Sequence, residues 1–312
     1  MRSKRKIVLS RTLLVAAAML LSSIGASAQT ATTQPAPASY DPSSAIEVNV
    51  GDGPTGVASD GTSIWVTNQF SGTVMKVAAS GAVLGRFTVG KNPTGVASDG
   101  TNVWVANNSG DTVTKLSLEG AVLGVYPVGD GPQAVLIAGQ NVWVANEKGN
   151  TVTKLSTAGA VLGTYRVGKR PVALASDGTN IWVANNKGNT VTKLSASGVA
   201  LGTYPVGDGP SGLAFDGTGM WVTNFFSGNV MKLDPSNGTV MARAIVGDGA
   251  AGITFDGSNL LVVNNGSNSV SVLGSDGNVY TTLKVGISPY GIAVTPNGIW
   301  VTNSGSDSIS RR

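Results

Sequence analysis

Few side chains in this sequence are able to carry out catalysis. The 312 residues include no histidine and no cysteine. A histidine general base, a cysteine nucleophile, a Ser–His pair and imidazole metal ligands are therefore excluded. Carboxylates remain as the acid–base groups and as ligands for hard metals, and the chain holds 17 of them.

Most of these carboxylates occupy recurring positions. Three glutamates, Glu47, Glu119 and Glu147, fall on different elements. Because residues that recur serve a repeat rather than one site, we predict no catalytic residue, no metal site and no cofactor. The recurring aspartates lie in Asp–Gly turns (Asp60, Asp99, Asp177, Asp216 and Asp256) or follow a Val–Gly pair (Asp52, Asp130, Asp208 and Asp248).

The elements that hold these residues form a sequence repeat. Seven positions are spaced by 39, 39, 39, 39, 40 and 39 residues, and an asparagine follows each by three residues. Such a period is typical of repeat architectures. The positions are Trp65, Trp104, Trp143, Trp182, Trp221, Leu261 and Trp300, and the asparagines are Asn68, Asn107, Asn146, Asn185, Asn224, Asn264 and Asn303.

Each repeat predicts four short strands. In the second copy these are residues 94–98, 103–107, 112–118 and 122–128, separated by turn residues such as Asp99–Gly100. An Asp–Gly pair between apolar runs indicates a hairpin. Pro127 in the last strand fits an outer edge.

Four antiparallel strands repeated seven times predict an all-β fold, a seven-bladed β-propeller over residues 45–312. Paired positions of the first strand, such as Gly56 and Ala58, are small, as expected where seven sheets converge. Residues 45–50 align with a fourth strand, whereas residues 309–312 align with a third. We therefore expect the N-terminal strand to pair with the C-terminal blade and close the ring.

The N-terminus predicts export. Residues 1–28 combine a basic head, the apolar run 13–21 and Ala26-Ser27-Ala28, which is typical of a signal peptide. Residues 29–44 form a spacer rich in proline, serine and threonine. We expect a periplasmic or extracellular protein with no membrane span in the mature chain, most simply a monomer.

Removal of residues 1–28 changes the charge. Five of 21 basic residues and none of 17 acidic ones are lost, which leaves 16 − 17 = −1. This near-neutral charge argues against a nucleic-acid partner.

The motif Trp-Val-Thr/Ala-Asn, as in Trp65–Asn68 and Trp104–Asn107, and the preceding Val-Gly-x-Gly-Pro, as in residues 50–54, resemble YVTN-type β-propeller repeats, which are close to NHL repeats. The resemblance covers nearly the whole mature chain. Similar propellers include binding scaffolds, lactonases and streptogramin lyases. The resemblance to the lyases implies a catalytic histidine with a metal ion, and no residue here is able to supply that histidine.

The repeated tryptophans and asparagines are predicted to be structural. We expect each tryptophan to pack between blades and each asparagine to bond the adjoining loop. The basic residues late in the third strand are expected to be solvated or paired; they are Lys76, Lys115, Lys154, Lys193, Lys232 and Arg311.

Departures from the repeat are the candidate binding residues. They fall on the face that carries the loops into the first strand and between the second and third strands, which we call the loop face. Phe70, Phe225 and Phe226 either contact a partner or fold back onto their own blades. The other candidates are a basic patch of Lys148, Lys169, Arg170 and Lys187, which otherwise serves solubility, and Tyr290 at the channel mouth.

Two classes of function follow. The first is an exported, non-enzymatic propeller that recognises a partner protein, a glycan or a small anion through the loop face. The alternative is a hydrolase or lyase of the propeller-lactonase or streptogramin-lyase kind, which the absence of histidine disfavours.

Overall fold

The computed structural model describes residues 45–312. The predicted signal peptide (1–28) and spacer (29–44) lie outside the described residues. No helix among the described residues is long and apolar enough to cross a membrane. The single helical element of this part of the chain is the 3-10 turn η3 (Asn186–Gly188).

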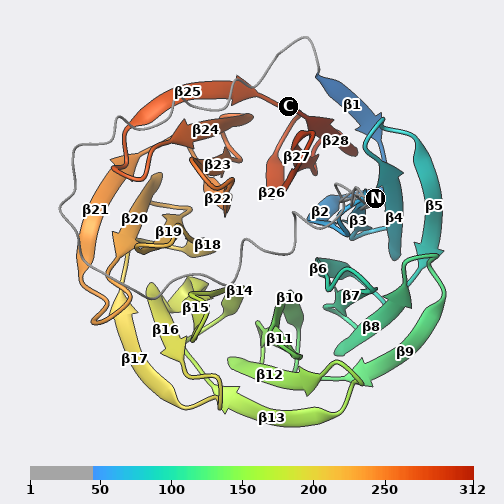
Figure 1. The fold of residues 1–312 in the computed structure, drawn as a ribbon, viewed down its shortest axis with the longest axis horizontal. Coiled ribbons are helices and arrows are strands. Elements are labelled where there is room, and N and C mark those ends of the chain that lie inside the picture. Colours follow the sequence, from blue (N-terminus) through green and yellow to red (C-terminus); the bar gives the residue numbers. More distant parts are fainter. Residues whose placement is uncertain (1–44) are drawn as a thin grey trace, which may run out of the picture. The chain divides into compact units, whose positions relative to one another are not determined.

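Seven four-stranded antiparallel sheets surround a central axis as the blades of a propeller (Figure 1). We number them in chain order. Blade 1 comprises β2 (Pro54–Ser59), β3 (Ser63–Asn68), β4 (Thr73–Ala78) and β5 (Val83–Thr88); blade 2 comprises β6 (Pro93–Ser98), β7 (Asn102–Asn107), β8 (Thr112–Ser117) and β9 (Val122–Pro127); blade 3 comprises β10 (Pro132–Ala138), β11 (Asn141–Asn146), β12 (Thr151–Ser156) and β13 (Val161–Arg166).

The remaining blades follow the same order of strands. Blade 4 comprises β14 (Pro171–Ser176), β15 (Ile181–Asn185), β16 (Thr190–Leu194) and β17 (Ala200–Pro205); blade 5 comprises β18 (Pro210–Phe215), β19 (Met220–Asn224), β20 (Asn229–Leu233) and β21 (Val240–Ile245); blade 6 comprises β22 (Ala250–Phe255), β23 (Leu260–Asn264), β24 (Ser269–Leu273) and β25 (Val279–Lys284); blade 7 comprises β26 (Pro289–Thr295), β27 (Gly298–Asn303), β28 (Ser308–Arg311) and β1 (Ile46–Asn49).

The predicted fold and ring closure are confirmed. β1 pairs with β28 in antiparallel register, with Val48 opposite Ile309. The carboxylate of Glu47 accepts hydrogen bonds from the hydroxyl groups of Ser308 and Ser310. One chain end therefore supplies the outer strand that the other end lacks. The predicted strands of blade 2 agree with the observed ones to within one residue at each end.

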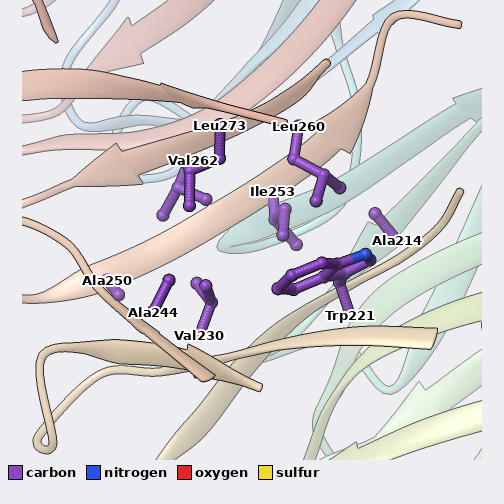
Figure 2. Close-up of a cluster of buried hydrophobic side chains, with 9 residues drawn as sticks. All are labelled: Ala214, Trp221, Val230, Ala244, Ala250, Ile253, Leu260, Val262 and Leu273. Atoms are coloured by element: carbon purple, nitrogen blue, oxygen red, sulfur yellow. The ribbon is translucent and has the colours of Figure 1, made fainter. Parts of the chain in front are cut away.

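The second strand of each blade forms the core. All six residues of β3 are buried, whereas residues of the outer strand β5 alternate between exposed and partly buried. The six tryptophans are buried within clusters that join neighbouring blades. Figure 2 shows one cluster, in which Trp221 of blade 5 lies beside Ile253 and Leu260 of blade 6.

The basic residue of the third strand links each blade to the next. In blade 4, Lys193 Nζ lies 5.2 Å from the centre of the Trp182 ring and donates a hydrogen bond of 2.6 Å to the carbonyl of Pro235 in blade 5. Blades 1, 2, 3, 5 and 7 repeat this arrangement. These charges are therefore paired with backbone carbonyls of the neighbouring blade.

Candidate functional site

Hydrogen bonds from strand residues and from the adjacent blade fix the loops of the loop face. Asn68 Oδ1 accepts a hydrogen bond of 3.0 Å from the backbone N–H of Gly51. The loop after the second strand ends in a residue with positive φ, such as Asp111 (φ 52°). The carboxylate of Asp111 accepts a hydrogen bond of 2.8 Å from the backbone N–H of Gly131 in the next blade. Adjacent blades therefore share loop contacts, and this scaffold orients the side chains that project from it.

A cavity of about 220 Å³ opens on the axis, and all seven innermost strands line it. Successive residues of the seven strands form an upper ring, a middle ring of glycine and alanine, and a lower ring. The upper ring, nearest the loops, is mixed in character, whereas the lower ring is entirely aliphatic, and neither ring holds a charged residue. The upper ring contains Thr55, Thr94, Gln133, Val172, Ser211 and Tyr290, and the lower ring contains Val57, Val96, Val135, Leu174, Leu213, Ile253 and Ile292.

One ion pair lies on the loops that lead into the strands lining this cavity, although neither of its residues lines the cavity itself. Arg170 Nε donates a hydrogen bond of 2.7 Å to Glu147 Oε1, and Arg170 Nη2 contacts the same oxygen. The Glu147 side chain is 12% exposed and that of Arg170 is 53% exposed. Arg170 directly precedes Pro171 and the wall residue Val172. The pair therefore lies where the loops enter the axial strands.

Tyr290 belongs to β26 of blade 7, which lies across the axis from blades 3 and 4 (Figure 1). Burial raises the pKa of the Tyr290 phenol, and the negative charge of Glu147 raises it further while the positive charge of Arg170 lowers it. The three side chains thus interact electrostatically although they come from distant segments.

The predicted aromatic residues differ in exposure. Phe70 is 76% exposed and Phe226 is 74% exposed, and they occupy equivalent positions in blades 1 and 5. Each ring rests against a glycine of its own blade, Gly53 or Gly209. Phe225 is instead partly buried against the cluster between blades 6 and 7. Two of the three rings therefore remain open on the loop face.

Phe226 also borders a groove. This groove has a volume of about 370 Å³ and extends over Asp248 and Asn265 of blade 6. The predicted basic patch lies on other loops of the same face, where Lys148, Lys169 and Lys187 are exposed. Arg170, the fourth member, is paired with Glu147, so the patch presents three lysines.

The repeated turn aspartates are engaged in the scaffold. Asp216 accepts hydrogen bonds from Trp221 Nε1 (2.8 Å) and from the backbone N–H groups of Thr218 and Gly219, and it lies 2.7 Å from Lys232 Nζ. Burial opposes ionisation of Asp216, but the hydrogen bonds from Lys232, Trp221 and Thr218 outweigh it and lower its pKa to about 2. The corresponding pKa values of Asp60, Asp99 and Asp177 are also lowered.

The residues at the mouth do not fit a catalytic metal. No group of three or more His, Cys, Asp or Glu side chains within residues 45–312 is placed to hold a metal ion. The one carboxylate at the mouth, Glu147, is already paired with Arg170. We therefore assign no reaction step to a metal.

Glu147 was not among the residues singled out from the sequence, which had identified Arg170 and Tyr290. A comparison of the repeats would have identified Glu147. Four residues after the tryptophan position, Glu147 is the one acidic residue among seven. The equivalent residues are Gln69, Asn108, Asn186, Phe225, Asn265 and Ser304.

Comparison with known proteins identifies the fold. No family model and no curated protein matches the sequence. A solved structure described as a streptogramin B lyase is 18% identical, with a TM-score of 0.75 over 86% of this chain and 96% of that chain. A catalytically inactive histidine-to-alanine variant of virginiamycin B lyase from Staphylococcus aureus, with quinupristin, is also 18% identical, with a TM-score of 0.74 over 86% of this chain and 98% of that chain.

Hydrazine synthase of Kuenenia stuttgartiensis is similar as well. It is 19% identical, with a TM-score of 0.72, and the alignment covers 82% of this chain and 94% of that chain. Differently named proteins thus share this architecture, and function resides in the sites that each carries. At this level of identity the comparisons show that the chain has the seven-bladed β-propeller fold of the streptogramin lyase structures.

Proposed function

We propose that this protein is an exported, non-enzymatic binding propeller that contacts a partner protein through its loop face. The observation that carries the proposal is the exposure of Phe70 and Phe226, at 76% and 74%, on loops whose equivalents carry serine, lysine or glycine. Exposed aromatic rings that do not serve a repeat are typical of contact surfaces.

The chemistry of the chain supports binding rather than catalysis. In the similar virginiamycin B lyase, the variant with one histidine replaced by alanine is catalytically inactive. Our sequence contains no histidine. Its best-defined buried carboxylates, such as Asp216, bond their own turns and the tryptophan of their own blade. A lyase of that kind is therefore not our proposal.

Two features of the loop face suit contact with a partner, and the N-terminal sequence suggests where the contact takes place. The groove beside Phe226 offers room for an inserted side chain. The lysines Lys148, Lys169 and Lys187 supply positive charge on the same face, which favours a partner with acidic groups. The pattern of residues 1–28 supports a periplasmic or extracellular location.

The test compares proteins that co-purify from the envelope of the producing cell. The variant F70S/F226S introduces the residue that blade 2 carries as Ser109. We expect it to lose a partner that the wild type retains. Phe225 stays unchanged because its removal would disturb packing against blades 6 and 7.

A matched control removes apolar surface elsewhere. Leu84 and Leu123, on the outer strands of blades 1 and 2, are 55% and 52% exposed. The variant L84S/L123S should keep the partner. Equal recovery of every protein by wild type and F70S/F226S contradicts the proposal.

A further inference from the structure

We infer that the axial cavity binds a small zwitterion with an apolar side chain, of the amino-acid class, whose charged groups bond Glu147 and Arg170 and whose side chain enters the aliphatic ring below. This site uses different residues from the proposed partner surface. The two proposals therefore succeed or fail separately.

Glu147, Arg170 and Tyr290 each differ from the residues at the equivalent positions of the other blades. Glu147 is the one acidic residue at its repeat position. Tyr290 is the one aromatic residue in the upper ring of the cavity. Arg170 occupies a position that in the other six blades carries Gly, Asn or Ser. A scaffold requires none of these three changes, because the other blades form the same structure without them.

Arg170 also adopts a backbone conformation that disfavours it. Its φ is 55°, in the left-handed region, as are the φ values of its six equivalents. An L-residue other than Gly or Asn is disfavoured there. Strained residues of this type cluster at ligand sites, which supports a functional role for the guanidinium.

Residues at the loop position of Glu147 bond the start of the innermost strand of the next blade. The equivalent residue Asn108 bonds Gln133 of the upper ring through its side chain. Asn186 and Asn265 bond the carbonyls of Pro210 and Pro289, which precede upper-ring residues of the next blade. Glu147 follows this pattern by bonding Arg170, one blade further on.

The ion pair keeps unused hydrogen-bonding capacity. Arg170 Nε and Nη2 both reach Glu147 Oε1. Among residues 45–312, Glu147 Oε2 and Arg170 Nη1 make no further hydrogen bond within the protein. One carboxylate oxygen and one guanidinium nitrogen of the pair therefore remain available to a ligand. A ligand ammonium can donate to the first, and a ligand carboxylate can accept from the second.

The charge balance selects a zwitterion. Glu147 and Arg170 neutralise each other, and the residues lining the cavity are uncharged. A ligand whose own ammonium and carboxylate balance each other adds no net charge beside this neutral pair and the uncharged wall. The aliphatic lower ring offers no side-chain partner for the hydroxyl groups of a sugar. A zwitterion with an apolar chain can bond the Glu147–Arg170 pair through its charged groups and contact the lower ring through its chain.

The cavity volume agrees with this class. A drug-sized ligand occupies a pocket of roughly 300–1,000 Å³. The axial cavity, at about 220 Å³, is smaller. Burial of apolar surface against the lower ring would favour aliphatic side chains over glycine.

The experiment measures binding of L-leucine to the propeller by isothermal titration calorimetry. Three related compounds each lack one group: 4-methylpentanoate lacks the ammonium, 3-methylbutan-1-amine lacks the carboxylate, and glycine lacks the apolar chain. We expect saturable binding of L-leucine and at least tenfold weaker binding of each related compound. Absence of L-leucine binding by the wild type overturns the inference.

Two variants restore the residue found in other blades and so preserve the fold. E147N introduces the residue at Asn108, and R170N introduces the residue at Asn92, which has a φ of 56°. Each should weaken L-leucine binding at least tenfold. The control K91S changes an exposed lysine in the loop before blade 2, which belongs to neither proposed site, and should leave affinity unchanged.

The remaining outcomes are also decisive. L-leucine binding that is unaffected in both E147N and R170N places the ligand elsewhere and overturns the inference. Binding of 4-methylpentanoate as tight as that of L-leucine, together with an unaffected E147N, identifies an anion site and overturns it as well. Melting curves of the variants that match the wild type establish that lost binding is not lost folding.

Discussion

At the scale of single residues, the chain uses its charged side chains mainly to hold blades together. Asp216 lies between Trp221 and Lys232 of its own blade, and Lys232 reaches the carbonyl of Ser275 in the next. An unpaired carboxylate in this environment would be costly. Asp216, Trp221 and Lys232 therefore form a chain of contacts that reaches the next blade.

Stability should depend on the ionisation of Asp216. Its pKa is lowered to about 2 in the folded state, below the unfolded value of about 3.9. The stabilisation is thus complete above the unfolded pKa and is lost as the pH falls through about 2. We expect D216N to lower the free energy of unfolding at pH 7 by on the order of 2 kcal/mol. Denaturation in urea at pH 7 and near pH 2 measures this.

The pH dependence distinguishes this role from general disruption. The difference between wild type and D216N should shrink toward pH 2, where the wild-type carboxyl becomes protonated as well. D130N, which changes an exposed loop carboxylate, serves as the control and should follow the wild type. A difference that stays constant from pH 7 to pH 2 rules out the charge of Asp216 as its cause.

At the scale of elements, the innermost strands determine how closely blades approach. A Cβ atom added to Gly56 would lie 2.2 Å from the carbonyl oxygen of Thr94 in the next blade, and one added to Gly291 would lie 2.4 Å from that of Thr55. These contacts explain the small residues of the first strands. They also leave the axial cavity narrow and lined partly by backbone.

Replacing Gly56 by alanine should therefore separate blades 1 and 2. We expect a loss of roughly 1–3 kcal/mol, typical of overpacking, measured as a lower melting temperature. G110A is the matched control, because its added Cβ would come no closer than 3.3 Å, to Thr112 Oγ1. Equal melting temperatures for G56A and G110A would show that the strands have room to move apart.

At the scale of the whole molecule, closure of the ring is the main requirement for stability. Blade 7 takes β26, β27 and β28 from one chain end and β1 from the other. Without β1, the backbone groups of β28 would form an exposed edge. The Glu47 contacts to Ser308 and Ser310 add side-chain hydrogen bonds across this junction.

Deleting residues 45–50 should lower the melting temperature sharply and promote self-association through β28. The parent for comparison is the chain that begins at Ala45, and light scattering measures association. The variant E47Q, which retains β1, should show a much smaller loss. An unchanged melting temperature after the deletion contradicts the role of β1 in closure.

The sequence alone determined the architecture, because each blade is encoded locally. The spacing of Trp65 and its equivalents defines the blades, alternation and Asp–Gly turns define the strands, and the unequal chain ends define the closure. Only the tertiary structure decided which of the residues that differ from the repeat lie close together and which are exposed. Phe225 and Phe226 are neighbours in sequence, yet the path of their loop buries one ring against the next blades and exposes the other.

Likewise, Glu147, Arg170 and Tyr290 belong to separate segments, and only the curvature of the ring brings them to one cavity mouth. The physical reason is that repeated residues are constrained by contacts recurring in every blade, which a sequence displays as a period. A binding site depends instead on the paths of several loops around the axis, and these paths leave no periodic pattern in the sequence.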